Sequence, residues 1–400
     1  MSDMNYDFDT VWDRFGHDAM KWEAARNPES AVYTDAESIV PMWVADMDFA
    51  TAPSVVDALK ERIDHPLFGY FALPDRYIDA IANWQKTRNG VTYPIERKNI
   101  MYQNSVLGGV SSFLSAYTLP GENVLVNSST YVGFQGTAKN AARTLCYSDL
   151  EKDENGVYRM NFEDMEKKIE DNKISVMIFC SPHNPTGRVW ERWEIEKVVE
   201  MCDRHDVKII SDEIWSDFIV DPNCKHIPTQ SVSERARQIT MALYAPSKTF
   251  NLAGLVGSYS LMYNQQMINK ITAVSASTHY NGANVLSCHA LIGGYEGGAE
   301  WVNQLVRYIR GNQEYLVNYM NEHFKGVSAY LPQGTYLLWV NVTDCGKDLD
   351  TVIKEMKDVG VLVNDGRAFK GDGFLRFNTA CPRSLCEEAM KRLHQVFEEK

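Results

Sequence analysis

The sequence predicts an α/β protein with a large domain, built on a mostly parallel sheet between helices, and a smaller α+β domain. Two observations support this prediction. Between residues 120 and 245, short continuous apolar runs alternate with segments of helical periodicity, which is typical of parallel strands covered by helices on both faces. The chain of 400 residues also exceeds the size of a single average domain.

The individual elements follow from local patterns. Residues 39–49, IVPMWVADMDF, form an apolar stretch that two aspartates interrupt, so we interpret them as a packed loop or a site segment and not as a core strand. Helices are expected at residues 53–63, 75–88, 134–142, 162–170 and 193–205. A further helix should follow the loop 104–109 and end at residue 117, and one or two long helices should lie within 285–324. The strands are expected at residues 99–103, 124–126, 144–147, 175–180, 207–211 and 239–244, and in the smaller domain at 336–340, 361–363 and 374–377.

Composition excludes several classes of partner. The formal charge of −13 argues against nucleic acid or an anionic membrane surface. No stretch approaches the ~18 apolar residues of a membrane span, and residues 1–15 are acidic without an apolar core. The eight cysteines form no CxxC pair and the nine histidines no HExxH motif. We therefore expect a cytoplasmic protein with reduced cysteines, no metal, no membrane contact and no nucleic-acid partner.

Polar loops follow four of the predicted strands and should converge at one edge of the large sheet. The loop NSVLGG (residues 104–109) opens a helix whose first amides could bind phosphate, although an ordinary strand–helix turn is the alternative. The loop SPHNPTG (residues 181–187) carries a proline on each side of His183-Asn184. These prolines stiffen the backbone and orient the Asn184 amide, which suits a hydrogen bond to a planar ligand, with a plain turn as the alternative.

The other two loops carry an acid and a lysine. Asp212 ends an apolar strand, where a buried carboxylate is costly unless it meets a cation such as a protonated pyridine nitrogen; an N-cap role is the alternative. Lys248 lies in the small-residue loop 245–254 and could hold an aldehyde cofactor as a Schiff base, although many such lysines are merely solvated. Tyr131 could cover the ring of such a cofactor or fill the core. Together these features match the needs of pyridoxal 5′-phosphate (PLP).

The chain resembles the fold type I PLP-dependent enzymes of the class I/II aminotransferase superfamily over essentially its full length. The matching segments are KWE (21–23), PMWVADMDF (41–49), FGY (68–70), SPHNPTGRV (181–189), SDEI (211–214), APSKTFNLAGL (245–255), LRFN (375–378) and ACPR (380–383). The asparagine–proline and serine–lysine motifs are shared across aminotransferases. The WVADMDF and SKTFNLAGL forms are more specific to the cystathionine β-lyase (C–S lyase, MalY/PatB-like) branch.

The resemblance implies roles in binding the cofactor. Lys248 would be the Schiff-base lysine and proton shuttle, Asp212 would pair with the pyridinium nitrogen, and Tyr131 would stack on the ring. The other cofactor contacts would come from Asn184 at the ring hydroxyl, from Ser247 and the backbone amides of Val106 and Leu107 at the phosphate, and from Tyr70, reaching a phosphate across the interface of a homodimer.

The resemblance also implies how a small amino-acid substrate is bound. Arg376 would grip the α-carboxylate bidentately. The other substrate contacts would be Val44, Ala45, Asn184 and Trp215. The expected divisions are an N-terminal segment, residues 1–50, that packs on the small domain and active site, a PLP-binding domain at 51–290 and a small α+β domain at 291–400.

Three functions agree with these residues. The branch-specific segments favour a C–S β-lyase that cleaves L-cystathionine or related cysteine S-conjugates to thiol, pyruvate and ammonia. An aminotransferase of aromatic or other apolar amino acids is the first alternative, because Trp215 could supply apolar pocket surface. Trp215 departs from the family pattern, since it stands where lyases tend to have histidine and aminotransferases tyrosine. A non-catalytic PLP-binding regulator is the second. The phosphate loop also departs from the family pattern, since Ser105 replaces a glycine and Gly108 a proline.

Overall fold

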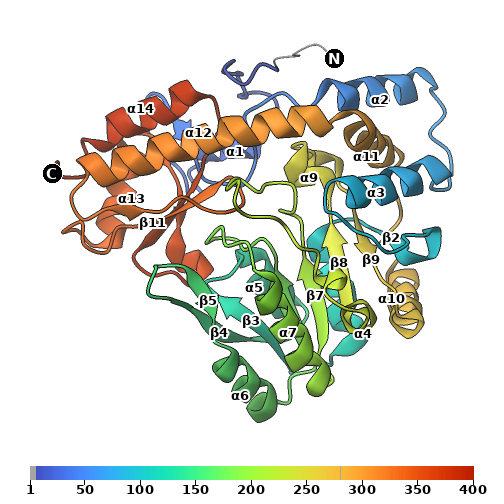
Figure 1. Ribbon diagram of the computed structural model, residues 1–400. Helices are drawn as coiled ribbons and strands as arrows, with labels where there is room; N and C mark the ends of the chain where they lie inside the picture. The colour runs from blue at the N-terminus through green and yellow to red at the C-terminus, as the bar shows by residue number, and fades with distance from the viewer. Residues whose placement is uncertain (1–5, 280) are drawn as a thin grey trace. The chain divides into compact units, whose positions relative to one another are not determined.

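The computed structural model describes residues 6–279 and 281–400, and the chain divides into two compact units (Figure 1). The first, here called the sheet unit, comprises Thr51–Asn184 and Arg188–Val302. The second, here called the terminal unit, comprises Pro185–Gly187, Asn303–Lys400 and the described part of Met1–Ala50. The expected division into residues 1–50, 51–290 and 291–400 stays a prediction.

The sheet unit is built on one eight-stranded sheet, which is parallel across its centre and antiparallel toward its ends. In spatial order its strands are β2 (Ile100–Gln103), β9 (Ser258–Leu261), β8 (Thr240–Tyr244), β7 (Lys208–Asp212), β6 (Val176–Cys180), β3 (Asn123–Ser128), β4 (Thr144–Lys152) and β5 (Tyr158–Met160). The predicted α/β class with a mostly parallel sheet is therefore confirmed.

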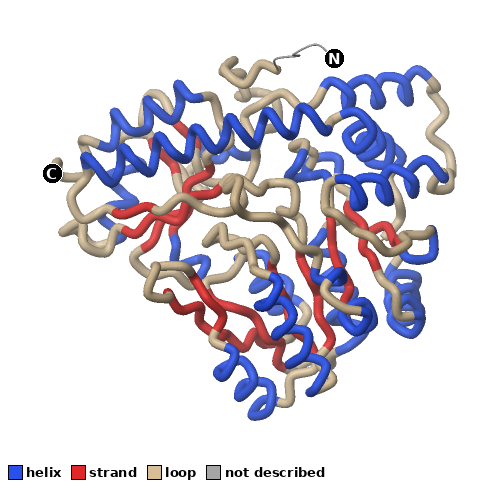
Figure 2. Tube along the Cα trace, viewed as in Figure 1, coloured by secondary structure: helices blue, strands red, loops and turns tan. Residues whose placement is uncertain are grey.

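Helices cover both faces of this sheet (Figure 2). The helices of the unit are α2 (Pro53–Asp64), α3 (Asp75–Thr87), α4 (Val106–Tyr117), α5 (Val132–Asn140), α6 (Phe162–Asn172), α7 (Arg192–Arg204), α8 (Glu234–Ile239), α9 (Pro246–Thr249), α10 (Gln265–Thr278) and α11 (Val285–Gly297). Along β6, Val176 and Ile178 pack into a core with residues of α4, α5 and α10, whereas Met177 and Phe179 pack with residues of α6, α7 and α8. Burial on both faces explains why the strands are continuous apolar runs.

Helix α4 lies close to the centre of the sheet because of one glycine. A Cβ at Gly109 would lie 2.5 Å from Leu243 Cδ2 of β8, a distance that no real side chain tolerates. Glycine therefore allows the helix backbone to approach β8 closely, which brings the start of α4 to the strand that precedes Lys248.

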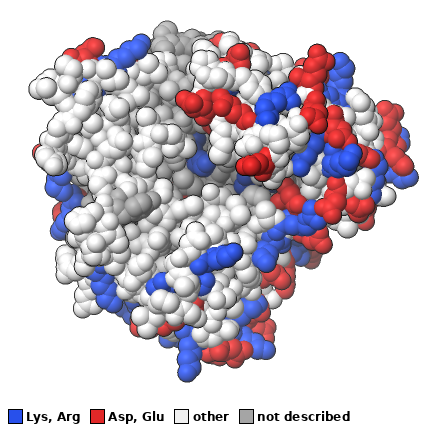
Figure 3. Space-filling view, turned by 180° about the vertical axis from the view of Figure 1, so that it is seen from behind, with Lys and Arg blue, Asp and Glu red and all other residues white. Residues whose placement is uncertain are grey.

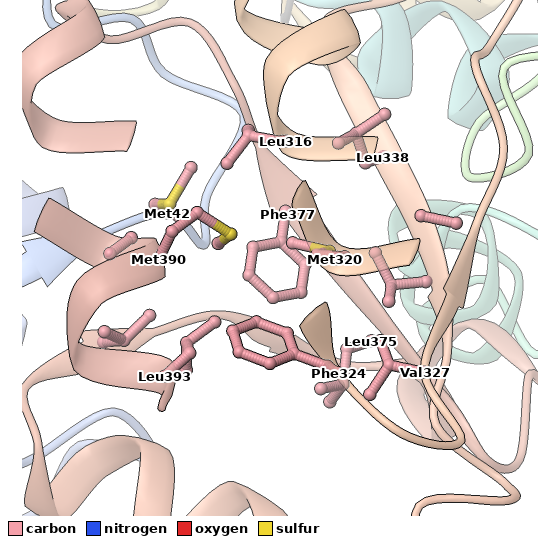
Figure 4. Packing of buried hydrophobic residues seen from close by; sticks show 14 of the residues in the cluster. Met42, Leu316, Met320, Phe324, Val327, Leu338, Leu375, Phe377, Met390 and Leu393 are labelled. Atoms are coloured by element: carbon pink, nitrogen blue, oxygen red, sulfur yellow. The ribbon is translucent and has the colours of Figure 1, made fainter. Parts of the chain in front are cut away.

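The terminal unit has its own sheets and core. Its four-stranded antiparallel sheet contains, in order, β10 (Ser328–Ala329), β11 (Leu337–Asn341), β14 (Phe374–Asn378) and β13 (Asn364–Asp365). A two-stranded parallel sheet joins β1 (Val40–Pro41) to β12 (Val361–Leu362). The remaining helices are α1 (Met20–Glu23), α13 (Leu349–Asp358), α14 (Arg383–Leu393) and α12 (Ala299–His323), whose first residues belong to the sheet unit. Phe324, Phe377 and Met390 lie in the core that these elements enclose (Figure 4).

The observed elements agree with the predicted ones in part. The segment 285–324, expected as one or two long helices, is two helices, α11 and α12, separated at Gly298. The strand expected at 144–147 continues to Lys152 as β4. Strand β9 and helix α10 were not predicted, because the SYSL sequence of β9 has no apolar run even though all four of its residues are buried.

Candidate active site

The predicted cofactor residues of the sheet unit follow four strands that are neighbours in the sheet. Asp212 is the last residue of β7, and Tyr131, Asn184 and Lys248 follow β3, β6 and β8. These four strands are adjacent and parallel. The register pairs Cys180 with Asp212 and Asp212 with Leu243, so the three central strands end level with one another. The loops therefore emerge at the same sheet edge, where open α/β sheets bind ligands.

Asp212 is a buried acid at this edge, with only 3% of its surface exposed. Burial raises its pKa to about 7, and the neighbouring Glu213 adds to the rise. The Ile214 amide, which donates to Asp212 Oδ1 at 3.1 Å, and the Lys248 ammonium act in the opposite direction. A further cation placed against this carboxylate would favour its charged form.

Glu213 stands beside Asp212 but is fully satisfied within the protein. Its Oε1 accepts hydrogen bonds from the Ser211 hydroxyl at 2.9 Å and the Thr229 amide at 3.0 Å. Its Oε2 lies 2.8 Å from His226 Nε2 and accepts from the Tyr244 hydroxyl at 2.6 Å. These partners hold the pKa of Glu213 below its usual value although burial acts to raise it. Of two adjacent acids, Asp212 is therefore the one available to a ligand.

Lys248 lies on α9, a single turn that is anchored through the next residue. The Thr249 hydroxyl donates to Asp217 Oδ2 at 2.7 Å. Asp217 is buried, accepts from Trp84 Nε1 at 3.1 Å and pairs with Arg88 Nε at 2.9 Å. Sequence patterns did not indicate Glu213 or Asp217 as supporting residues, because all of the partners of their carboxylates except Ser211 are distant along the chain.

Trp215 is close to the lysine. Only 2% of its surface is exposed. Lys248 Nζ lies 5.9 Å from the centre of the Trp215 ring, within the range of a cation–π contact. The sequence-based expectation that Trp215 shapes the substrate pocket stays a prediction, and the structure places it beside Lys248.

The start of α4 offers unused backbone donors. Ser105 caps the helix by accepting from the Gly108 amide at 2.9 Å. Within the described part of the chain, the amides of Val106 and Leu107 have no such acceptor, as expected for the first turn of a helix. The Tyr131 ring packs over Gly133, and a Cβ at Gly133 would also lie 2.9 Å from Leu107 Cδ1. An aromatic face and two helix-start amides thus lie near each other.

The last two cofactor residues differ in their surroundings. Ser247 is half-buried on α9, directly before Lys248. Tyr70 is fully exposed on the segment between α2 and α3. It lines a cavity of about 630 Å³ together with its neighbours and with Ala283, Asn284 and Val285. The structure does not group Tyr70 with the strand-edge residues through any hydrogen bond among the described residues.

The predicted carboxylate and pocket residues belong to the terminal unit. Arg376 is buried in β14, where its Nη2 donates to Asn364 Oδ1 at 2.7 Å and its guanidinium lies 4.2 Å from the centre of the Phe369 ring. Val44 and Ala45 are partly buried on the loop after β1, as expected for a packed loop. That loop is hydrogen-bonded to β14 within the same unit.

Among residues 6–279 and 281–400, no three or more His, Cys, Asp or Glu side chains are gathered in a way that could hold a metal ion. No helix in the same described ranges is long and apolar enough to cross a membrane.

Comparison with known proteins places this chain in a family. The family model for aminotransferase class I and II matches residues 38–393, so the chain belongs to that family. The cystathionine β-lyase PatB of Bacillus subtilis (strain 168) is 32% identical over 390 residues, covering 96% of this chain and 98% of PatB. The resemblance to the MalY/PatB-like branch is therefore confirmed.

Two solved structures are similar over nearly their whole length. A PLP-bound protein of Clostridium difficile 630, provisionally described as an aminotransferase, is 34% identical with a TM-score of 0.92, covering 98% of this chain and 100% of its own. Cystalysin of Treponema denticola, which contains a PLP cofactor, is 29% identical with a TM-score of 0.92, covering 98% and 99% of the two chains. These likenesses confirm the fold type I prediction.

Proposed function

We propose that this protein is a PLP-dependent C–S β-lyase that cleaves L-cystathionine or related cysteine S-conjugates to a thiol, pyruvate and ammonia. The observation that carries this proposal is the strand-edge group of Lys248, Asp212, Asn184 and Tyr131 in a chain that is 32% identical to a cystathionine β-lyase. Arg376, buried in the terminal unit, adds a guanidinium suited to an α-carboxylate.

The residues of the sheet unit fit PLP in three respects. Asp212 is a buried acid whose pKa burial raises to about 7, and a protonated pyridine nitrogen placed against it would favour its charged form. The amides of Val106 and Leu107, with the Ser247 hydroxyl, would bind the phosphate group. Tyr131 presents a ring face for stacking, and Lys248 supplies the amine that attaches an aldehyde.

Each residue has a defined task in the proposed reaction. PLP, when bound, acts as an electron sink for the bond that breaks at the substrate Cα. Lys248 Nζ would remove the Cα proton, and the Asp212 carboxylate would favour the protonated form of the pyridine nitrogen. Asn184 orients the cofactor ring, and Arg376 binds the α-carboxylate through two hydrogen bonds. The electron pair left at Cα would form a Cα=Cβ bond as the Cβ–S bond breaks, so that the thiolate leaves and takes up a proton. Water would then hydrolyse the remaining three-carbon unit to pyruvate and ammonia.

The test uses purified protein with PLP and L-cystathionine, with and without a 2-oxo acid, and measures pyruvate and free thiol. Equal amounts of pyruvate and thiol without any oxo acid are expected. Lys248→Ala should abolish both products, because the variant lacks the amine that takes the Cα proton. Turnover that needs an oxo acid and releases no thiol would contradict the lyase proposal.

A second candidate is an aminotransferase of aromatic or other apolar amino acids. The buried indole of Trp215 beside Lys248 favours it by adding apolar surface near the reacting amine. The similarity to the Clostridium difficile protein favours it as well. Aromatic amino acids paired with a 2-oxo acid are its assay, and formation of a new amino acid without thiol is its result.

We further propose that the protein is a cytoplasmic homodimer in which Tyr70 reaches the partner's cofactor phosphate. Tyr70 and Phe68 are exposed aromatic side chains beside a cavity of the sheet unit, which is the kind of surface that a second copy would cover. One face of the molecule also shows a broad area without charged side chains (Figure 3). All eight cysteines are free thiols, which suits a reducing compartment.

A further inference from the structure

The loop that follows β1, residues 43–48, is held by side chains outside it, which donate hydrogen bonds to the backbone carbonyls of the loop. The side-chain amide of Asn378 donates to the Val44 carbonyl at 2.7 Å and to the Asp46 carbonyl at 2.6 Å. The Tyr336 hydroxyl donates to the Ala45 carbonyl at 3.1 Å. Three consecutive carbonyl oxygens are therefore bound by side chains of the neighbouring sheet. We call residues 43–48 the anchored loop.

Asn378 is fully buried and uses its whole amide in this arrangement. Besides its two donated hydrogen bonds, its Oδ1 accepts from the Ala380 amide at 2.9 Å. A buried amide satisfied on both its nitrogen and its oxygen has one preferred orientation. Asn378 therefore fixes the position of the loop and does not merely fill space.

The opposite side of the anchored loop is held by the N-terminal segment. Lys21 is fully buried and donates to Asp48 Oδ2 at 2.5 Å and to the Asp46 carbonyl at 2.9 Å. Arg14 pairs with Asp46 at 2.9 Å and with Asp48 at 2.8 Å. The Trp22 indole donates to Asp48 at 2.9 Å. The positive charges of Lys21 and Arg14 balance the negative charges of Asp46 and Asp48. The loop is therefore held without an uncompensated buried charge.

The anchored loop lies on the face of β14 that carries Arg376. Side chains two residues apart on a strand point to the same face, so Arg376 and Asn378 share one. The Tyr336 hydroxyl responds to both neighbours: burial raises its pKa, Asp46 raises it further, and Arg376 lowers it. Asn378, which binds the loop carbonyls, therefore stands two residues from Arg376 on the same face of β14 within the terminal unit.

We propose that Asn378 is a positioning residue that sets the affinity of this protein for the α-carboxylate of amino-acid substrates. Asn378 binds the carbonyls of Val44 and Asp46 and so keeps these acceptors away from Arg376. In a displaced loop, the same carbonyl oxygens would be free to accept hydrogen bonds from the guanidinium and would compete with the substrate carboxylate. The inference rests on the proposed function in one respect only, namely that the ligand of Arg376 is an α-amino acid. It holds for a lyase and for an aminotransferase alike.

The test compares Asn378→Asp and Asn378→Ala with the wild type. Asn378→Asp keeps the shape and the acceptor for Ala380 but turns a carboxylate toward two carbonyl oxygens. Tyr336→Phe is a milder variant that loses one hydrogen bond to the loop. Asn321→Ala is the matched control, because Asn321 makes an equivalent pair of hydrogen bonds, at 2.7 and 2.9 Å, to Ala329 of β10 at the sheet edge.

The ligand is α-methyl-DL-methionine, which has no Cα proton and so cannot turn over, and its binding to the PLP-loaded protein is measured by calorimetry. Both Asn378 variants should bind it about tenfold more weakly or worse, as expected for the loss of one or two hydrogen bonds, while Tyr336→Phe shows a smaller loss. PLP affinity should stay within about twofold, because the cofactor residues belong to the sheet unit. Asn321→Ala should bind both ligands normally.

A second readout uses the protein without cofactor. Hydrogen exchange of residues 43–48 should speed up in both Asn378 variants and stay unchanged in Asn321→Ala. Faster exchange with unchanged affinity for α-methyl-DL-methionine would overturn the proposal, as would equal losses of PLP and amino-acid affinity. A wild-type protein that binds α-methyl-DL-methionine but releases no thiol or pyruvate from L-cystathionine would refute the lyase proposal instead, and the comparison of affinities would still stand.

Discussion

Asp212 shows how one residue can carry a stability cost that a ligand removes. In the protein without cofactor, burial raises the pKa of Asp212 from its ordinary 3.8 to about 7. The folded state therefore holds a proton that the unfolded chain releases between these pH values. Its stability falls as the pH rises through this window and then levels off above about pH 7.

We accordingly expect Asp212→Asn to stabilise the cofactor-free protein at pH 8. The gain in the free energy of unfolding should grow by about 1.4 kcal/mol per pH unit between pH 5 and 7 and reach about 4 kcal/mol at most. Urea unfolding across this pH range measures the free energy of unfolding, and Asp149→Asn, at an exposed position, is the control substitution. PLP should stabilise the wild type more than the variant, and a pH-independent difference would contradict the argument.

At the scale of elements, the lysine-bearing turn α9 depends on helix α3. Helix α3 supplies Trp84, and Arg88 follows at its C-terminal end; both bind Asp217, which in turn holds Thr249. Phe250, directly after α9, packs against the Trp84 ring at 5.9 Å and the Trp301 ring at 5.8 Å. A four-residue helix is unstable alone, so these contacts keep Lys248 in place.

Asp217→Asn should therefore lower stability and slow the attachment of PLP to Lys248. The variant loses the charge that faces Arg88, and because that arginine is partly exposed, we expect a loss of about 2 kcal/mol. Denaturant unfolding and stopped-flow absorbance after PLP addition measure the two effects. Thr249→Ser, which keeps the hydroxyl, should behave as wild type and Thr249→Val should resemble Asp217→Asn. Normal attachment kinetics in Thr249→Val would show that the anchor does not position the lysine.

At the scale of the whole molecule, the proposed dimer makes a distinctive prediction. Lys248→Ala and Tyr70→Ala should each be impaired alone. If Tyr70 acts on the partner's site, a hybrid of the two variants contains one intact and one doubly altered site. Refolding an equal mixture should restore about one quarter of wild-type activity, since half of the random dimers are hybrids.

The control for this experiment is a mixture of the two separately refolded variants, assayed directly after mixing, which should show only the residual activity of the two variants. Sedimentation at several concentrations gives the oligomeric state independently. No recovery from co-refolded hybrids that are shown to form would place Tyr70 in its own chain's site. The net charge of −13 disfavours close approach of two copies, so the uncharged area in Figure 3 is the face on which we expect it.

The local sequence was sufficient for the strands and for the residues at their ends. A parallel strand buried on both faces must be a continuous apolar run, so β3, β6, β7 and β8 were predicted, and with them the positions of Asp212 and Lys248. The family resemblance followed from the same short segments. Strand β9 escaped this reasoning, because buried serines satisfied by hydrogen bonds do not look apolar.

Only the tertiary structure decided what supports these residues. Asn378 lies 334 residues from Val44 in the sequence, and Asp217 lies 133 residues from Trp84, so no local pattern could pair them. Adjacent acids such as Asp212 and Glu213 look equivalent in the sequence. Folding makes them different, because four hydrogen-bond partners offset the cost of burying Glu213 and keep its pKa below its usual value. Asp212 has a raised pKa, which a cationic group of a cofactor would lower.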